Sequence, residues 1–490
     1  MTRITIVALA LTAVVLAQQP ATEADALARI RDEGMARSQV QPVFDMLTVT
    51  IGPRLTASPA HTRAAEWMRD RLASYGLANV HLEPWQFGRG WTLERLAAEL
   101  VEPRYLPLIA YADGWSASTA GDLTAPPVWI GGRTPDEVAA MRDQLKGAIV
   151  MTQPIMTNFV RRDRPNPSDQ RYEANSAAYA TSVGQRGAGR GGGPTPAQQI
   201  AATLRDAGAG VILKPSAGEH GTVFVTGRDG GPGAVPSVTL AAEHYNMIAR
   251  MLQQHVPVRL RVGVSTKFYD NDAGNAYNVI AELPGTDPAI RDEVVMFGAH
   301  LDSWHTGVGA TDNADGVTTV VEAMRILKAS GVRLRRTVRV ALWGGEEQGL
   351  LGSRAWVKAH LAGDANAAAR DKFDVYFNID NGTGAIYGWY LQNNDEVRPI
   401  FDSWLEPLRS LGARRNNIEP VGSTDHLSFI EAGVPGFNPI QDYVNYDIRT
   451  HHTNMDTVER LNVDDLRQAA VVMATFVHNA ANLDRKIPRK

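Results

Sequence analysis

Apolar and polar positions follow two different rhythms in the last part of the chain, from about residue 275 onward. Short apolar runs, typical of buried strands, are separated by segments in which apolar residues recur every three or four positions, which is typical of helices. The runs predict strands at 277–283, 294–299, 336–343 and 374–379, and the segments between them predict helices at 316–327 and 350–360. Strands that alternate with helices predict an α/β fold, a central sheet flanked by helices.

The part of the chain before residue 275 has two textures that meet near residue 115. In the first, Ser58 and Pro59 are typical of the start of a helix and Gly76 of its end, and a strand-like segment follows at 80–85. In the second, short strands and turns dominate up to about residue 262. Strands are predicted there at 145–151, 211–213, 235–240 and 258–262, with one helix at 196–207.

Residues 161–193 are polar and then rich in glycine, especially over 183–193. Arginines among glycines are also found in tails that bind nucleic acid. Because the chain has little positive charge to attract a polyanion, we interpret this stretch as a solvated, flexible loop. The role of its glycine-rich part does not follow from the sequence.

The first residues are typical of an export signal. Arg3 precedes an almost unbroken apolar run from Ile4 to Ala17, and small residues before Gln18 offer a cleavage site. An uncleaved anchor or a buried N-terminal helix is the alternative, but the run is short for a membrane span, which needs about 20 residues. We therefore expect a signal peptide at 1–17 and a secreted or periplasmic protein without membrane attachment after cleavage.

Composition narrows the chemistry. The chain has 490 residues, of which 44% are apolar and 21% charged, as in ordinary globular proteins, and its net charge of −4 gives no reason to expect nucleic acid as a partner. It has no cysteine. Disulfides, zinc fingers, iron–sulfur clusters and thiol nucleophiles are therefore excluded, and any metal site must use His, Asp and Glu.

Metal-binding residue types gather where the predicted strands end. They are His300 and Asp302 after strand 294–299, Asp312 before helix 316–327, Glu346 and Glu347 after strand 336–343, Asp380 after strand 374–379, and His451 and His452 near the C-terminus. Each alone is weak evidence, since such residues also cap helices or lie on surfaces. Open α/β sheets bind their ligands at the carboxyl ends of the strands, so the joint pattern predicts a metal site there.

Charge balance favours two zinc ions. Two Zn²⁺ and one hydroxide are neutralised by Asp312, Glu347 and Asp380, and His300 and His452 then give each ion one nitrogen ligand. Adjacent glutamates in an extended segment point in different directions, so one can ligate while the other faces a water. The pair thus provides a general base beside a water acidified by metal.

These residues resemble a known family, the co-catalytic zinc exopeptidases that include secreted bacterial aminopeptidases, glutamate carboxypeptidase and plasma carboxypeptidase Q, with most similarity to the last branch. The resemblance is carried by four motifs and by Gly52-Pro-Arg-Leu55. The motifs are Gly298-Ala-His-Leu-Asp-Ser-Trp304, Gly309-Ala-Thr-Asp-Asn313, Leu342-Trp-Gly-Gly-Glu-Glu-Gln-Gly349 and His451-His-Thr-Asn-Met-Asp-Thr457. The middle region resembles a protease-associated domain through Leu145-Lys-Gly147 and Val235-Pro-Ser-Val238, and 161–193 departs from it.

The resemblance implies a fold and a domain order. The fold is α/β, with a mixed central sheet flanked by helices and an inserted, mainly β domain like the protease-associated domain. The peptidase domain would comprise a first segment at 18–114 and a catalytic segment at 263–490, with the insert at 115–262. A homodimer is expected only from the resemblance.

The resemblance also implies roles. Asp312 would bridge two zinc ions, and Asp312–Asn313 would be a cis peptide. His300 and Asp380 would complete one zinc site, and Glu347 and His452 the other. The His-Thr-x-x-Asp-Thr pattern selects His452 rather than His451. Glu346 would be the general base for hydrolysis of a terminal peptide bond by a metal-bridging hydroxide, and Asp302 would orient His300.

Three alternatives remain open from the sequence. A non-catalytic binding protein on the same fold would lack metal, although every ligand type is present here. Another two-zinc family with the same donor pattern inserts a domain after the Glu-Glu pair, and the stretch from Glu347 to Asp380 is too short for it. A single-zinc glutaminyl cyclase would not need His300 or Asp312. The substrate is expected to be a short peptide or dipeptide, while the substrate-binding residues, and the choice between aminopeptidase and carboxypeptidase, stay unknown.

Overall fold

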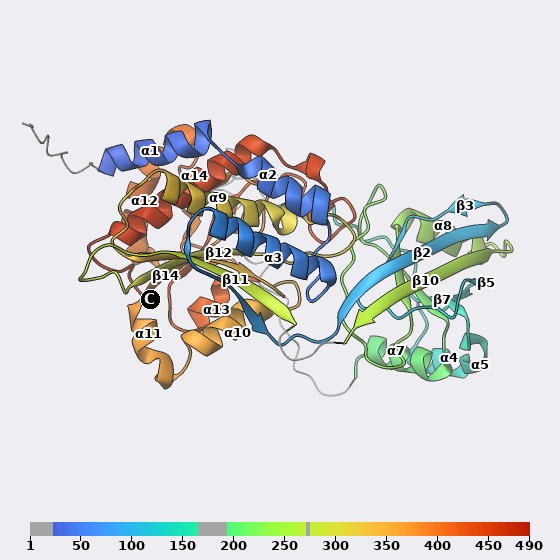
Figure 1. Ribbon diagram of the computed structural model, residues 1–490. Helices are drawn as coiled ribbons and strands as arrows, with labels where there is room; N and C mark the ends of the chain where they lie inside the picture. Colours follow the sequence, from blue (N-terminus) through green and yellow to red (C-terminus); the bar gives the residue numbers. More distant parts are fainter. Residues whose placement is uncertain (1–22, 165–193, 271–274) are drawn as a thin grey trace, which may run out of the picture.

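The computed structural model describes residues 23–164, 194–270 and 275–490 (Figure 1). The predicted signal peptide 1–17 and most of the predicted loop 161–193 lie outside these residues. Figure 1 shows two lobes. The large lobe contains residues 23–89 and 275–490, and the small lobe contains the described residues between 90 and 269. Among the described residues, no helix combines the length and apolar character needed to cross a membrane.

A seven-stranded sheet forms the centre of the large lobe. Its order is β1 (Ala78–Trp85), β11 (Ala276–Leu283), β13 (Thr337–Trp343), β12 (Val294–His300), β14 (Phe373–Asn378), β16 (Gly436–Gln441) and β15 (Ile386–Tyr390). The four strands β13, β12, β14 and β16 are parallel to one another. The outer strands β1, β11 and β15 pair antiparallel with their neighbours. The predicted mixed central sheet is confirmed.

Helices cover both faces of this sheet (Figure 1). One face is covered by α1 (Glu23–Ala36), α2 (Val40–Asp45), α3 (Pro59–Ser74), α9 (Asp315–Ala329), α12 (Arg398–Leu405) and α14 (Val463–Asn482). The other is covered by α10 (Leu351–His360), α11 (Ala367–Lys372) and α13 (His426–Glu431). Side chains of β12 alternate between the two cores: Val295 and Phe297 face the first, and Met296 faces the second.

The path of the chain through the parallel strands explains where a site forms. From β12 the chain passes through α9 to β13 on one side, and then through α10, on the opposite face, to β14 on the other side of β12. Ligands bind in α/β sheets at such a reversal, outside the carboxyl ends of the strands. The reversal at β12 therefore favours a binding site beyond the carboxyl end of that strand, where His300 is the last residue.

Local sequence signals predicted half of these elements, within one or two residues of their observed ends. Helix α3 begins at Pro59, and the Ser58 hydroxyl accepts the main-chain N–H of His61 at 3.2 Å, as the predicted N-cap should. The predicted strands 277–283, 294–299, 336–343 and 374–379 correspond to β11, β12, β13 and β14. Helix α14 was not predicted, because it is apolar on nearly all sides and lacks a one-sided pattern.

Two further sheets make up the small lobe. One has the order β3 (Leu106–Pro107), β2 (Gly90–Glu102), β10 (Arg259–Tyr269) and β5 (Leu123–Ala125). The other has the order β4 (Ala110–Ala112), β9 (Ser237–Leu240), β8 (Val211–Pro215), β7 (Ile149–Met151) and β6 (Val128–Trp129). Helices α4 (Pro135–Ala140), α5 (Arg142–Leu145), α7 (Pro196–Ala207) and α8 (Ala242–Gln253) complete the lobe.

The small lobe is longer than the predicted insert 115–262. Strand β2, which the sequence analysis missed, pairs with β10 along its whole length, from Gly90 opposite Tyr269 to Glu102 opposite Arg259. The two predicted boundaries therefore fall inside the small lobe and not at its edges. The division of the chain into domains itself stays a prediction.

Candidate metal centre

Five of the predicted donors reach one place from different elements. His300 ends β12, Asp312 lies in the short π-helix η2 (Ala310–Ala314) before α9, Glu347 follows β13, and Asp380 follows β14. His452 comes from a loop between η6 (Tyr446–Thr450) and η7 (Val458–Arg460). Three donors thus end or follow strands of the sheet, Asp312 lies at the start of the segment that leads into α9, and His452 lies on a loop.

The first group of donors is buried. The Nε2 atom of His300 lies 3.1 Å from Oδ1 of Asp312 and 3.6 Å from Oδ1 of Asp380. All three side chains are at most 5% exposed, and their donor atoms lie close enough together to hold one metal ion.

The second group shares Asp312 with the first. The Nε2 atom of His452 lies 3.3 Å from Oδ2 of Asp312 and 2.8 Å from Oε2 of Glu347. The His452 side chain is 27% exposed, so this side of the site reaches solvent. Asp312 thus directs one oxygen toward each histidine.

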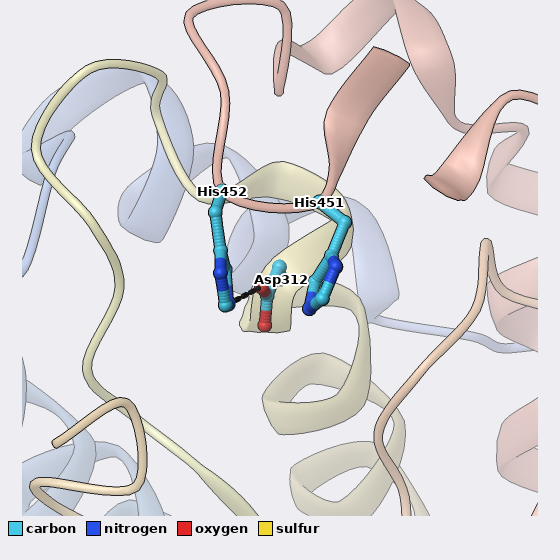
Figure 2. Close-up of side chains that lie close together, drawn as sticks. All are labelled: Asp312, His451 and His452. Carbon is cyan, nitrogen blue, oxygen red and sulfur yellow. Dashed lines mark ion pairs between the residues drawn. The ribbon is translucent and has the colours of Figure 1, made fainter. Parts of the chain in front are cut away.

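His451 also approaches Asp312. Figure 2 shows both imidazoles directed toward the Asp312 carboxylate, and donor atoms of all three residues lie within reach of one ion. The His451 ring lies 3.8 Å from the ring of His452 and stacks on Tyr446 at 5.1 Å. Among the described contacts, His452 has ion pairs with Asp312 and Glu347, and none is described for His451. The choice of His452 as ligand stays a prediction that this pair supports.

The residues fit a bound cation. His300 Nε2, Asp312 Oδ2 and Glu347 Oε1 are buried and have no hydrogen-bond partner among the described residues. Buried polar atoms are rarely left without a partner, so these three donor atoms fit a cation as their partner. Nitrogen and carboxylate donors suit Zn²⁺.

The carboxylates around the site raise the pKa values of His300 and His452. Burial works to lower the pKa of His300, but Asp380, Asp302 and Asp312 outweigh it and raise the pKa well above its usual value. The pKa of His452 rises to about 9, because Glu347 and Asp312 outweigh the effect of burial. In the metal-free protein, protons on the two imidazoles supply the positive charge that the carboxylates require.

Asp302 is placed to position its neighbours. The ring Nδ1 of His300 donates to the main-chain carbonyl of Asp302 at 3.0 Å, and the Asp302 carboxylate lies 3.6 Å from the same atom. The carboxylate also accepts the main-chain N–H groups of Glu346 (3.2 Å) and Glu347 (3.3 Å), and the hydroxyl of Thr56 (2.9 Å). One buried side chain thus fixes a donor histidine and the turn that carries both glutamates.

Glu346 lies in this turn beside the donors. Burial raises the pKa of its carboxyl well above the usual value, and Asp380, Asp425 and Glu347 add to the rise while His300 opposes it. A carboxylate in such surroundings accepts a proton readily. This is the property required of a general base.

Three positioning residues were missed by the sequence analysis, although each lies in a quoted motif. Asp456 accepts the Thr311 main-chain N–H (2.7 Å) and hydroxyl (3.0 Å) and the Asp312 N–H (3.2 Å). The indole of Trp304 donates to Oε2 of Glu347 at 2.7 Å. The motifs drew attention to these positions, but no local pattern indicated which atom each side chain reaches.

The third missed residue is Arg54, in the Gly52-Pro-Arg-Leu55 motif. It is fully buried, and its guanidinium donates to five main-chain carbonyls at 2.9 to 3.2 Å, those of Leu47, Gly52, Leu301, Val308 and Gly309. Arg54 thereby ties the loop between β12 and η2 to the N-terminal segment. The peptide bond between Asp312 and Asn313 at the end of this loop is cis, as predicted.

The mixed sheet and the buried His, Asp and Glu donors at its carboxyl edge define the class of the protein, a zinc metallopeptidase with an α/β fold. The model of "Peptidase family M28" matches residues 278–477, which include all five donors. The segment that carries the donors therefore matches peptidase family M28.

Relatives of known name support this assignment over most of the chain. Carboxypeptidase Q of Bos taurus is 26% identical over 457 residues, 93% of this chain and 88% of that protein. A solved structure named Peptidase M28 precursor, from Shewanella amazonensis SB2B, is similar with a TM-score of 0.71 and 26% identity, and covers 95% of this chain and 98% of that one. The zinc aminopeptidase BSAP from Bacillus subtilis has the same fold, with a TM-score of 0.57, 22% identity, and coverage of 90% and 94%.

Proposed function

We propose that the protein is a secreted two-zinc exopeptidase that removes terminal residues from short peptides or dipeptides. His300 and Asp380 would hold one zinc ion, Glu347 and His452 would hold the other, and Asp312 would bridge them. The proposal adds three statements to the assignment as a zinc metallopeptidase: the number of zinc ions, the residues that bind each ion, and the export of the protein. The predicted signal peptide 1–17 is the reason to expect export.

The observation that carries the proposal is the position of Asp312 between two donor groups. Its two carboxylate oxygens lie 3.1 Å from the ring nitrogen of His300 and 3.3 Å from that of His452. A carboxylate that faces two separate donor groups is suited to bridge two metal ions. The main-chain and side-chain contacts of Asp456 hold Asp312 in this orientation.

The residues of the chain supply the remaining steps. Zinc ions bound here would polarise the scissile carbonyl and acidify a water. Glu346 would accept the proton from that water and deliver it to the leaving amine, which its raised pKa permits. Asp302 holds Glu346 at its main-chain N–H and so keeps the base beside the donors. The reaction is hydrolysis: the peptide C–N bond breaks, and water supplies the hydroxyl and the proton.

The surroundings of the site support a small substrate. A narrow cleft beside the donors is lined by Trp304, Gly307, Gly309, Asp312, Glu347, His452, Thr453 and Asp456. The small lobe packs against the loop that carries His452, with the main-chain N–H of Val225 donating to the carbonyl of His452 at 2.9 Å. We therefore propose short peptides as substrates; the expected homodimer stays a prediction.

The test combines metal analysis with Glu346→Gln. We expect two zinc equivalents per chain in the wild type and in the variant, because Glu346 is not a ligand, and a loss of turnover of about 10²- to 10⁴-fold in the variant, the usual contribution of a general base. Zinc is measured by elemental analysis of the purified proteins. Full activity in Glu346→Gln would refute the role of this residue.

A substrate panel tests the exopeptidase assignment. Dipeptides with both termini free, with a blocked amino group, and with a blocked carboxyl group are compared on the zinc-loaded protein. Loss of cleavage on blocking one terminus identifies the group that is recognised. Equal cleavage of peptides blocked at both termini would contradict an exopeptidase.

A further inference from the structure

We propose that contacts from the small lobe position one of the metal ligands, His452. Two of its segments, 163–164 and 219–225, hold the loop 445–454 in the conformation in which His452 faces Asp312 and Glu347. The small lobe would therefore set the affinity of one zinc site and leave the other almost unchanged. This inference rests on the two-zinc function proposed above.

The loop 445–454 has little regular structure of its own. It follows β16 and contains only the short π-helix η6 (Tyr446–Thr450). Two of its non-glycine residues, Asn445 and His452, have left-handed backbone conformations, with φ of 64° and 59°. Such a conformation costs roughly 1–2 kcal/mol per residue, so the loop needs outside contacts to maintain it.

Residues 221–225 hold one end of the loop. Phe224 and Thr453 form an antiparallel β-bridge, and the main-chain N–H of Val225 donates to the carbonyl of His452 at 2.9 Å. The side chain of Asn454 accepts the N–H of Val223 at 2.7 Å and donates to the carbonyl of Gly221 at 3.3 Å. The proposed ligand and the residues after it are thus paired with the small lobe as a short strand would be.

Asp163 and Arg164 hold the other end. The Asp163 carboxylate accepts the main-chain N–H groups of Asn445 (2.8 Å) and Ile448 (3.1 Å), and so acts as an N-cap supplied to η6 by another lobe. The buried Arg164 guanidinium forms two hydrogen bonds with Asp447, at 2.8 and 3.1 Å. It also lies over the ring of Tyr443 at 4.5 Å.

The middle of the loop is held by Arg449. Its guanidinium donates to the carbonyl of Glu219 and to the hydroxyl of Thr222, both at 3.0 Å, and lies 2.8 Å from the ring of His220. The small lobe therefore contacts the loop at its start, its middle and its end. No other proposed metal ligand has a described hydrogen bond from its main chain to the small lobe.

The consequence is different for the two proposed zinc sites. His300 and Asp380 keep their geometry without the small lobe, because their strands are paired within the large lobe. Asp312 is held by Asp456, which also belongs to the large lobe. His452 would lose the contacts that keep its backbone in the left-handed region. The zinc site of Glu347 and His452 would then bind its ion more weakly, because the ligand must be ordered on binding.

The test uses two small-lobe contacts that touch no donor. Asp163→Ala removes both acceptors from η6, whereas Asp163→Asn keeps one acceptor oxygen. Asn454→Ala removes the side-chain pairing with residues 221–223. The matched controls are Asp122→Ala, which breaks the ion pair with Arg95 within the small lobe, and Asn366→Ala, whose amide bonds two main-chain carbonyls far from the site. All are made in the full chain.

The measurement is a zinc titration of the metal-free proteins against a chromophoric chelator, with circular dichroism and thermal unfolding as checks of folding. We expect Asp163→Ala and Asn454→Ala to weaken one of the two zinc sites by about 10- to 100-fold and to leave the other within about 2-fold. Asp163→Asn should recover most of the loss. The two controls should bind both ions like the wild type.

Each outcome separates this inference from the function on which it rests. Unchanged affinities in Asp163→Ala and Asn454→Ala, or an equal loss at both sites, overturn the role of the small lobe and leave the two-zinc function intact. A wild-type protein that binds only one ion, or none, overturns the two-zinc function instead. If Asp163→Ala does not fold, the zinc titrations of Asn454→Ala and Asp163→Asn decide the role of the small lobe. If Asn454→Ala does not fold, the two Asp163 variants decide it.

Discussion

The metal centre joins two regions that achieve their geometry in different ways. His300 and Asp380 lie at or just after the ends of hydrogen-bonded parallel strands, where neighbouring strands fix their positions. His452 lies on a loop whose conformation depends on contacts with the small lobe. A sheet edge positions side chains through local pairing, and a loop needs partners from elsewhere in the chain. The comparison suggests that one half of the site is rigid and that the other half depends on the arrangement of the lobes.

Among the tests of this comparison, we expect the largest effect from alanine substitutions of His451 and His452. We expect His452→Ala to lose one zinc equivalent and most activity, because Glu347 and Asp312 alone give that ion only carboxylate ligands from the protein. His451→Ala should keep both equivalents, since its ring has no ion pair with Glu347 among the described contacts. Elemental analysis measures both variants. The reverse result would move the ligand to His451.

A smaller effect is expected from Trp304→Phe. The substitution keeps an aromatic ring but removes the indole N–H that donates to Oε2 of Glu347 at 2.7 Å, so this oxygen keeps only its ion pair with His452 among the described contacts. Loss of such a supporting hydrogen bond typically weakens metal binding by about 10- to 100-fold. A zinc titration should detect this at the site of Glu347 and His452.

Trp115→Phe is the matched control for this prediction. Trp115 belongs to the same aromatic cluster, and its indole N–H donates to the carbonyl of Arg89 at 2.7 Å, away from the donors. Its zinc affinities should equal those of the wild type. An equal loss in the two variants would assign the effect to packing of the cluster.

The smallest effect concerns pH in the metal-free protein. The folded pKa of His452, raised to about 9 by Glu347 and Asp312 against the effect of burial, lies above the value of about 6.5 in an unfolded chain. The protonated imidazole therefore stabilises the fold fully below pH 6.5, and this contribution is lost as pH rises toward 9. Because the side chain is a quarter exposed, we expect about 1–2 kcal/mol.

Denaturant unfolding of the metal-free protein at several pH values between 6 and 9.5 measures this effect. The free energy of unfolding should fall over this interval in the wild type. His452→Ala should have a flatter profile, because the titrating group is gone. Equal slopes in the two proteins would show that other groups cause the pH dependence.

Sequence patterns predicted the strands that carry part of the candidate site. Apolar runs located β12, β13 and β14, and polar residues at their carboxyl ends located His300, the Glu346–Glu347 pair and Asp380. These predictions succeed because a buried strand leaves a local pattern and because parallel strands bring their carboxyl ends to one edge. The same residue pattern included Asp312 and the two histidines near the C-terminus, and the motif resemblance favoured His452 over His451 and implied the role of each donor.

The remainder depended on partners distant in sequence. Strand β2 was missed because its mixed pattern becomes a strand only through pairing with β10. The five carbonyls bound by Arg54 are brought together by folding, and no residue near Arg54 indicates them.

By itself, then, the sequence determined which residue types were available for a metal, excluded thiolate ligands, and located the donors that follow strands. The tertiary structure decided how the loop 445–454 is held. Asp163 caps η6, and Val225 pairs with His452 across more than two hundred positions of sequence. Local propensity does not specify such contacts, because each one forms only when the rest of the chain has placed both partners.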